Sequence, residues 1–316
     1  MPNLPASYFG IVLGLVGLGN AWRAAHGAWG WSALPGELLV LLGAGLWLAL
    51  LTLFAAKWLI ARAVAVREAA DPVSGSFLGI PGVSGMLVGT ALLPYDRTVS
   101  VALFALGLIY AVGFAVWQTG SLWQGGRDHA ATTPILYLPT VAGSFVAAAG
   151  AAAFGWQDWG LLAFGAGLFS WLAIESVLVH RLYTSTPLPE VLRPVLGIQL
   201  APPAVGSLAL LAVAGEEARM VLHVMLGYAL LQVLVMLRLL PWILRQPFAV
   251  SYWAFTFGLT ALATVALRLS NGSSVVVTLA PVLFTLANIV VLVALVGTMR
   301  LLLAGRLLPI LATQAR

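Results

Sequence analysis

LLVLLGAGLWLALLTLFAA, residues 38–56, is a run of uncharged and mostly apolar side chains that begins after Glu37 and ends before Lys57. A helix that crosses the hydrocarbon core of a bilayer needs about 20 such residues. The run therefore predicts a membrane-spanning helix, and the pattern recurs along the chain. Cutting the sequence at charged and turn residues gives ten apolar segments, with approximate limits at 7–25, 36–60, 75–93, 97–119, 134–154, 157–180, 194–214, 218–241, 247–269 and 274–303.

The composition excludes most other classes of protein. Of the 316 residues, 61% are hydrophobic and 8% are charged, whereas a soluble domain has about 25% charged residues. The net charge of +5 comes from 15 basic and 10 acidic residues, which is too few for a nucleic-acid-binding surface. The sequence has no cysteine, and it shows no metal-binding, nucleotide-binding or catalytic-triad motif. We expect a single transmembrane domain over residues 1–316, without enzymatic activity, metal, cofactor or nucleic-acid partner.

Lysine and arginine are concentrated after every second segment. Eleven lie there or in the C-terminal tail, against four on the opposite side: Lys57, Arg62, Arg67, Arg127, Arg181, Arg193, Arg238, Arg245, Arg300, Arg306 and Arg316 against Arg23, Arg97, Arg219 and Arg268. Loops rich in basic residues stay in the cytoplasm. The bias predicts that both termini are cytoplasmic, which is consistent with an even number of helices.

Prolines near the middle of odd-numbered segments indicate how the helices are arranged. Pro81, Pro139 and Pro202 lie near the middles of the third, fifth and seventh segments. Proline in mid-membrane is tolerated where a neighbouring helix or a cavity satisfies the freed carbonyl group. We expect five tandem helical hairpins, with the odd helices as an inner, kinked ring around a central pore and the even helices facing lipid. The alternative is that proline is simply common in membrane helices.

Small residues at helical spacing mark the same odd segments. Gly10 and Gly14 lie on the first, Gly82 and Gly89 on the third, and Gly143 follows Pro139 on the fifth. Such stripes usually indicate close helix packing, but five bare faces on one axis would also leave a conduit. We therefore treat these residues as candidate pore-lining or kink positions.

The ninth segment carries a candidate gate. Phe255 and Phe257 point about 200° apart on a helix, so only one can face an axis. The face of Phe257 continues through the small or hydroxyl-bearing residues Thr260 and Thr264, whereas the face of Phe255 continues through leucines. The pattern predicts that Phe257 faces the pore, although a stripe of this kind can also be core.

Two charges draw attention by their depth: Glu175 lies some five residues inside the cytoplasmic end of the sixth segment, and Arg238 lies at similar depth in the eighth. A charge in mid-membrane costs about 2.5–3.5 kcal/mol on insertion scales, so each needs a partner or a function. Their similar depth predicts a structural ion pair between two lipid-facing helices. A proton relay is the alternative.

The chain resembles the tellurite-resistance/dicarboxylate transporter family. The resemblance extends over essentially the full length and is carried by nine short strings in order: LPASYFGIVLG at 4–14, GMLVG at 85–89, SLWQGG at 121–126, LYLPTVA at 136–142, FGAGLFSWL at 164–172, GIQLAPP at 197–203, GYALLQ at 227–232, MLRLLPW at 236–242 and WAFTFG at 253–258.

The resemblance implies a ten-helix, five-hairpin pore protein that assembles as a homotrimer in the bacterial inner membrane, with a fold shared by plant slow anion channels. It places the occluding pore phenylalanine at Phe257 and the facing glycine at Gly10. The kinking prolines correspond to Pro81, Pro139 and Pro202. One departure is Val12, where some relatives carry a proline.

The expected function is an anion channel or exporter linked to tellurite resistance. Its permeants would be small inorganic anions such as chloride and nitrate, with tellurite as a further candidate. The proposed pore faces have no acidic residue, which favours weakly hydrated anions. The alternatives are a proton-coupled C4-dicarboxylate permease, which would need a cationic or titratable site in mid-membrane, and a structural or sensor subunit, which would show no conductance.

Overall fold

The apolar segments fold as helices in the computed structural model, which describes residues 4–270 and 274–308. Helices are the expected outcome because a chain in lipid must satisfy every backbone N–H and C=O group within itself. No strand is present among the described residues. The prediction of an all-helical membrane protein is therefore confirmed, while Met1 and Arg316, whose side of the membrane the charge bias predicts, lie outside the described residues.

Five long, uninterrupted helices form the periphery, and we call them the outer helices. Between 22% and 39% of the residues in their apolar windows are buried. Their remaining surface is apolar, which suits contact with lipid tails. They are α2 (Leu34–Ile60), α5 (Arg97–Trp123), α7 (Gln157–Thr184), α9 (Arg219–Ile243) and α11 (Ser274–Leu303).

Five shorter helices form the centre, and we call them the inner helices. The spans that contain α6, α8 and α10 are 72–78% buried. They are α1 (Phe9–Trp29), α4 (Ile80–Ala91), α6 (Gly143–Ala153), α8 (Ala201–Ala214) and α10 (Ala254–Leu269). Each follows a tighter or wider helical turn, which is a 3₁₀ segment at Ala6–Tyr8, Ser74–Gly79, Glu190–Leu200 and Val250–Trp253 and a π-helical segment at Leu138–Ala142. An inner helix and the turn before it together make an inner segment.

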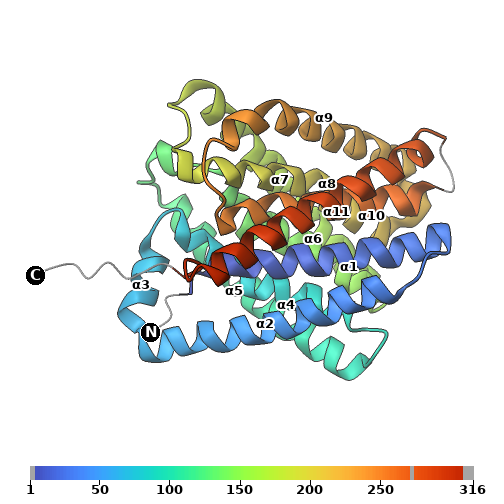
Figure 1. The fold of residues 1–316 in the computed structure, drawn as a ribbon, viewed down its shortest axis with the longest axis horizontal. Helices are drawn as coiled ribbons and strands as arrows, with labels where there is room; N and C mark the ends of the chain where they lie inside the picture. Colours follow the sequence, from blue (N-terminus) through green and yellow to red (C-terminus); the bar gives the residue numbers. More distant parts are fainter. Residues whose placement is uncertain (1–3, 271–273, 309–316) are drawn as a thin grey trace, which may run out of the picture.

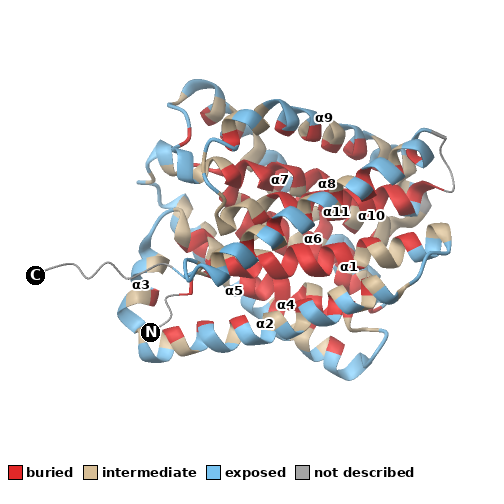
Figure 2. Cartoon of the chain, in the orientation of Figure 1, coloured by how far each residue is buried: buried red, intermediate tan, exposed pale blue. Residues whose placement is uncertain are grey.

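Contacts between helices define both hairpins and a ring. Each inner helix packs against the outer helix that follows it, as α1 does with α2 and α10 with α11. The inner helices also contact one another in the closed order α1, α4, α6, α8, α10 and back to α1. The helices run roughly along the long axis of the molecule (Figure 1). Burial is concentrated on the inner ones, whereas α2 and α9 expose much of their surface (Figure 2).

The number of membrane crossings is less sharply defined than the hairpins. Within the described residues, eight helical spans are long and apolar enough to cross a bilayer. A ninth results if α3 (Arg62–Ala70) and the segment Ser74–Ala91, which meet at a bend of 111°, are one broken span. This set does not include α1, so the count of ten crossings stays a prediction.

The three prolines lie where an inner segment changes its helical type. Pro81 and Pro202 are the second residues of α4 and α8, and Pro139 is the second residue of the π-helical segment before α6. Proline is tolerated in the first turn of a helix because its missing N–H group has no intrahelical partner there. The sequence placed these prolines in mid-span, and the structure shows that each span is divided at that point.

Candidate functional site: a cavity enclosed by the inner segments

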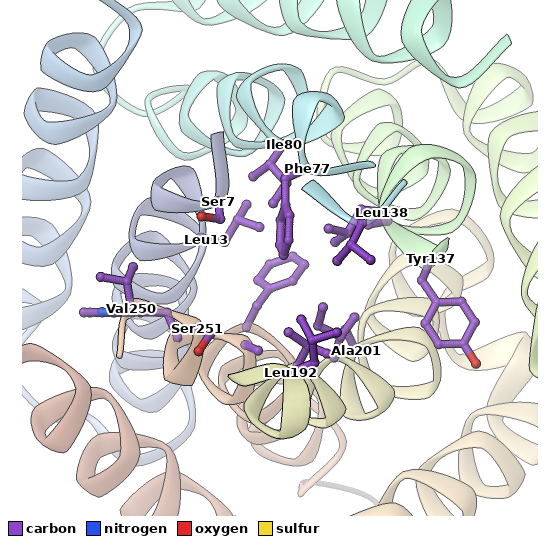
Figure 3. A pocket seen from close by; sticks show the side chains of 18 of the residues that line it. Ser7, Leu13, Phe77, Ile80, Tyr137, Leu138, Leu192, Ala201, Val250 and Ser251 are labelled. Atoms are coloured by element: carbon purple, nitrogen blue, oxygen red, sulfur yellow. The ribbon is translucent and has the colours of Figure 1, made fainter. Parts of the chain in front are cut away.

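A cavity of about 490 Å³ lies at the end of the ring where the inner helices begin. All five inner segments or the chain just before them contribute to its wall, for example through Ser7, Ile80, Leu138, Leu192 and Val250. Figure 3 shows side chains from these elements converging on one space. The N-terminal ends of five helices therefore surround the cavity, and a helix N-terminus carries a partial positive charge.

The wall of this main cavity is apolar and carries no ionisable acid or base other than the hydroxyl of Tyr137, among the described residues that line it. Its polar contributions are few: the hydroxyls of Ser7, Ser74 and Ser251 and the amide of Gln246. The Ser251 hydroxyl has no hydrogen-bond partner within the described residues. Tyr137 contributes little polarity, because its hydroxyl points away from the cavity (Figure 3). An anion here would meet neither a repelling carboxylate nor a strong cationic trap.

Bulky apolar residues close the cavity at its deep end. The last lining residue along each inner segment is Leu13, Ile80, Phe145, Val205 or Phe257. Beyond this level α1 and α10 pack directly against each other, since a Cβ atom added at Gly17 would lie 2.4 Å from the Thr260 hydroxyl oxygen. The same added atom would lie 3.7 Å from the Phe257 ring. Phe257 thus lies where the open space ends.

The two phenylalanines of α10 occupy different environments, and the role of Phe257 as a pore gate stays a prediction. Phe257 is partly exposed and lines the main cavity. Phe255 is buried and packs against Gly197, where an added Cβ atom would lie 2.7 Å from its ring. Gly10 also lines the cavity, but no atom lies within 4 Å of its missing Cβ position. The phenyl ring is close to Gly17 and not to Gly10, so the glycine nearest the ring lies about two helical turns further along α1 than expected.

At most of the other glycines predicted to line the pore, a neighbouring helix occupies the space where a side chain would lie. A Cβ atom added at Gly14 would lie 2.3 Å from the Thr256 hydroxyl oxygen. At Gly82 the added atom would lie 2.8 Å from the Gly107 carbonyl oxygen, and at Gly89 it would lie 2.7 Å from the backbone nitrogen of Phe104. The reason is physical: a residue without a side chain lets another backbone approach, and helices in lipid gain dispersion energy from that approach. Close packing replaces the pore-lining prediction at these three positions.

The remaining predicted residues are divided between wall and core. Pro202 lines the main cavity. Thr260 and Thr264 are buried, and their hydroxyls donate to the carbonyl oxygens of Phe257 and Thr260 at 3.0 and 2.8 Å, so neither is free to contact a permeant.

The other three predicted positions lie behind the wall. The Pro81 carbonyl accepts a hydrogen bond from Trp47 at 3.2 Å. Pro139 lies behind the wall beside Gly79. A Cβ atom added at Gly143 would lie 3.8 Å from Cγ2 of Val83.

Glu175 does not pair with Arg238. Its carboxylate accepts hydrogen bonds from the Tyr137 hydroxyl, from the Trp171 indole at 3.0 Å and from the Tyr228 hydroxyl at 2.6 Å. Arg238 is exposed and forms no ion pair within the described residues.

The helix geometry explains this correction. Arg238 lies ten residues beyond Tyr228 on α9, which is about 15 Å along the helix and on a different face. Neutral hydrogen-bond donors from one inner segment and two outer helices therefore stabilise the partly buried carboxylate.

Sequence reasoning missed Phe77, which lies just before α4. Its side chain enters the main cavity from the side opposite Leu192 (Figure 3). In the sequence Phe77 stands between Gly75 and Gly79, as a single bulky residue where small residues recur at helical spacing.

A closed ring of helices around an apolar cavity, enclosed by long lipid-facing helices, defines a membrane channel or transporter. The chain belongs to the voltage-dependent anion channel family, whose sequence profile matches residues 3–299. The resemblance to tellurite-resistance and related transport proteins is thereby confirmed.

Individual relatives agree with this assignment. The chain is 33% identical to the tellurite resistance protein TehA homolog of Haemophilus influenzae over 271 residues, covering 85% of this chain and 82% of the relative. It is 28% identical to the S-type anion channel SLAH4 of Arabidopsis thaliana, covering 83% of this chain and 73% of the relative. An uncharacterised transporter of Methanocaldococcus jannaschii, MJ0576, is 24% identical over 65% of this chain and 66% of its own length.

Proposed function

We propose that the protein passes small inorganic anions along the axis of the inner ring and that Phe257 is the gate. The observation that carries this proposal is the main cavity, which five inner segments line without a single acidic side chain. Phe257 lies at its deep end, where α1 and α10 come into contact. An aromatic ring offers no hydrogen bond in place of an anion's hydration shell, so it blocks both sterically and by dehydration.

The electrostatics favour anions over cations. The N-terminal ends of the inner helices surround the cavity, and their partial positive charge attracts an anion weakly. Ser7 and Ser74 line the wall as well, and their hydroxyls supply donors. A proton-coupled dicarboxylate permease would need a cationic or titratable group in this wall, and the described lining residues provide none apart from a tyrosine whose hydroxyl is directed elsewhere.

The physiological setting is part of the same proposal. The protein would act as an anion channel or exporter of the bacterial inner membrane, associated with tellurite resistance, with 1–316 as a single domain. The charge bias supports cytoplasmic termini, and the family resemblance supports a homotrimer. The main cavity would then open toward the cytoplasm, because the inner segments begin on the side where the basic residues gather.

The test is anion flux through liposomes that contain the purified protein. We expect chloride and nitrate to cross faster than in protein-free liposomes, while gluconate and potassium do not. Succinate flux that depends on a proton gradient would support the dicarboxylate permease instead. No flux of any anion, in wild type or in variants at Phe257, would contradict the proposal and favour a structural or sensor role.

A further inference from the structure

A second cavity, of about 270 Å³, lies at the other end of the inner ring. It is lined by Arg23, Ala24, Gly27 and Ala28 of α1 and by Leu267 and Arg268 of α10. The tight contact between α1 and α10 at Gly17 and Thr260 separates it from the main cavity. The charge bias places this end of the molecule on the extracytoplasmic side.

Arg23 is held in place by its neighbours. Its Nε and Nη2 donate to the two carboxylate oxygens of Glu37 at 2.8 and 2.6 Å, and its Nη1 donates to the carbonyl oxygen of Ala91 at 2.7 Å. The Tyr95 hydroxyl donates to the same carboxylate. A guanidinium has five N–H groups, so two of those on Arg23 remain without a partner in these contacts, one on each terminal nitrogen. Its position is fixed, but its hydrogen-bonding capacity is not exhausted.

Arg268 is different because it has no partner at all within the described residues. No hydrogen bond or ion pair involves its side chain, and the residue is exposed. Glu37, the carboxylate engaged by the neighbouring arginine, is already bound by Arg23 and Tyr95. The sum of the three charges, Arg23, Arg268 and Glu37, is +1. Two like charges that line one small cavity repel each other, and an anion between them would relieve that repulsion.

We propose that the second cavity is a binding site for a small inorganic anion, held by the free N–H groups of Arg268 and the remaining ones of Arg23. The floor suits such a ligand, because Ala24, Gly27 and Ala28 leave it bare and no atom lies within 4 Å of the missing Cβ of Gly27. Charge-assisted hydrogen bonds from a guanidinium are about twice as strong as neutral ones. The site would capture or release anions at the extracytoplasmic mouth, and this role in transport rests on the proposed function.

The first experiment measures binding without requiring conduction. Purified protein in a neutral detergent, with no added phospholipid, is unfolded thermally in sodium nitrate, sodium chloride or sodium gluconate at equal ionic strength. A ligand that binds only the folded state raises the unfolding temperature. We expect nitrate or chloride to stabilise the wild type more than gluconate does, and Arg268→Gln to reduce that difference. Arg268 makes no contact that its removal would leave unpaired, so the variant should fold.

Arg97→Gln is the matched control. Arg97 lies on the same predicted side of the membrane, donates to the Phe154 carbonyl at 3.3 Å and does not line the second cavity. It should keep the anion-dependent stabilisation, as should Arg268→Lys, which preserves the charge. Equal stabilisation of the wild type and of Arg268→Gln would overturn the proposal.

The second experiment records currents from spheroplasts while the external anion concentration is varied. Arg268→Gln should raise the half-saturating external concentration about fivefold, since one exposed charge contact is lost, whereas Arg268→Lys should stay close to wild type. If the stabilisation depends on Arg268 but the protein carries no current, the anion site is supported and the proposed function is contradicted. If Arg268→Gln shows normal current, the same half-saturating concentration and the same anion-dependent stabilisation as the wild type, the anion site is contradicted and the proposed function is supported.

Discussion

The inner and outer helices of this protein differ in length, in continuity and in what surrounds them. Outer helix α7 runs for 28 residues without interruption, whereas inner helix α6 runs for 11 and follows a π-helical segment. Exposed side chains on the outer helices include Leu59 at 84% and Phe169 at 73% exposure, which would be costly in water. Lipid tails make that exposure favourable. The inner helices meet protein on most sides and the main cavity on the remaining one.

This difference shows how one chain divides two tasks. The outer helices supply insertion, because their apolar length matches the bilayer. In the proposed function the inner segments supply the passage, and each is broken near the main cavity and carries proline, glycine or both near the break. The polar contact at Glu175 connects the two sets, since Tyr137 comes from an inner segment while Trp171 and Tyr228 come from outer helices.

The largest effect we expect comes from truncating Phe257, the proposed gate at the closed end of the main cavity. Phe257→Ala should raise chloride or nitrate conductance by an order of magnitude or more, because the ring at the closed end of the main cavity blocks by size and by dehydration. The measurement is anion current at matched surface expression.

Phe255→Ala is the control, two residues away on the same helix. Phe255 packs against Gly197 in the core, so its truncation should lower the free energy of unfolding by about 3–5 kcal/mol without opening the pore. If Phe257→Ala stays closed while Phe255→Ala conducts, the barrier lies on the other face of α10. If neither conducts, Phe77 becomes the next residue to truncate, since it enters the same cavity.

An intermediate effect is expected where the two sets of helices are joined. Glu175→Ala leaves the hydroxyls of Tyr137 and Tyr228 and the Trp171 indole without their acceptor, which should lower the free energy of unfolding by about 2–3 kcal/mol. Arg238→Ala should change it by less than about 0.5 kcal/mol, as for an ordinary surface position. Detergent unfolding of the purified variants provides the comparison. Equal losses in both would restore the ion pair predicted from the sequence.

The sequence predicted what depends on local pattern. Apolar length predicted the helices, and the regular recurrence of turns predicted the hairpins. The difference in angle between Phe255 and Phe257 predicted that only one of them faces the axis, because two residues on one helix have a fixed geometry, and Phe257 does line the main cavity. None of these inferences required knowledge of which helices are neighbours.

The rest depended on neighbours that a single sequence does not reveal. A glycine stripe is the same string whether it borders a void, as at Gly10, or another helix, as at Gly89. Glu175 and Arg238 had similar estimated depth, but depth alone does not determine which face of a helix a side chain occupies. The sequence around Phe77 does not reveal either that its side chain enters a cavity, because that depends on the four other inner segments that complete the wall.

The smallest effect we expect separates a packed glycine from an open one on the same helix. In Gly14→Ala the new methyl group would lie 2.3 Å from the Thr256 hydroxyl oxygen and 2.8 Å from Cε3 of Trp253. The threonine cannot simply rotate away, because its hydroxyl donates to the Trp253 carbonyl at 2.8 Å. The helices α1 and α10 must therefore separate slightly, at a cost of about 1–3 kcal/mol in the free energy of unfolding.

Gly10→Ala and Gly113→Ala are the two controls, one inner and one outer, and neither position has an atom within 4 Å of the added methyl group. Alanine favours a helix over glycine by up to about 1 kcal/mol, so both variants should be neutral or slightly more stable than the wild type. Thermal unfolding of the three variants measures the difference. Destabilisation by Gly10→Ala as large as that by Gly14→Ala would mean that the main cavity does not reach α1. A benign Gly14→Ala would mean that the inner ring is looser than its contacts indicate, and the separation between the two cavities would then have to come from the Phe257 ring alone.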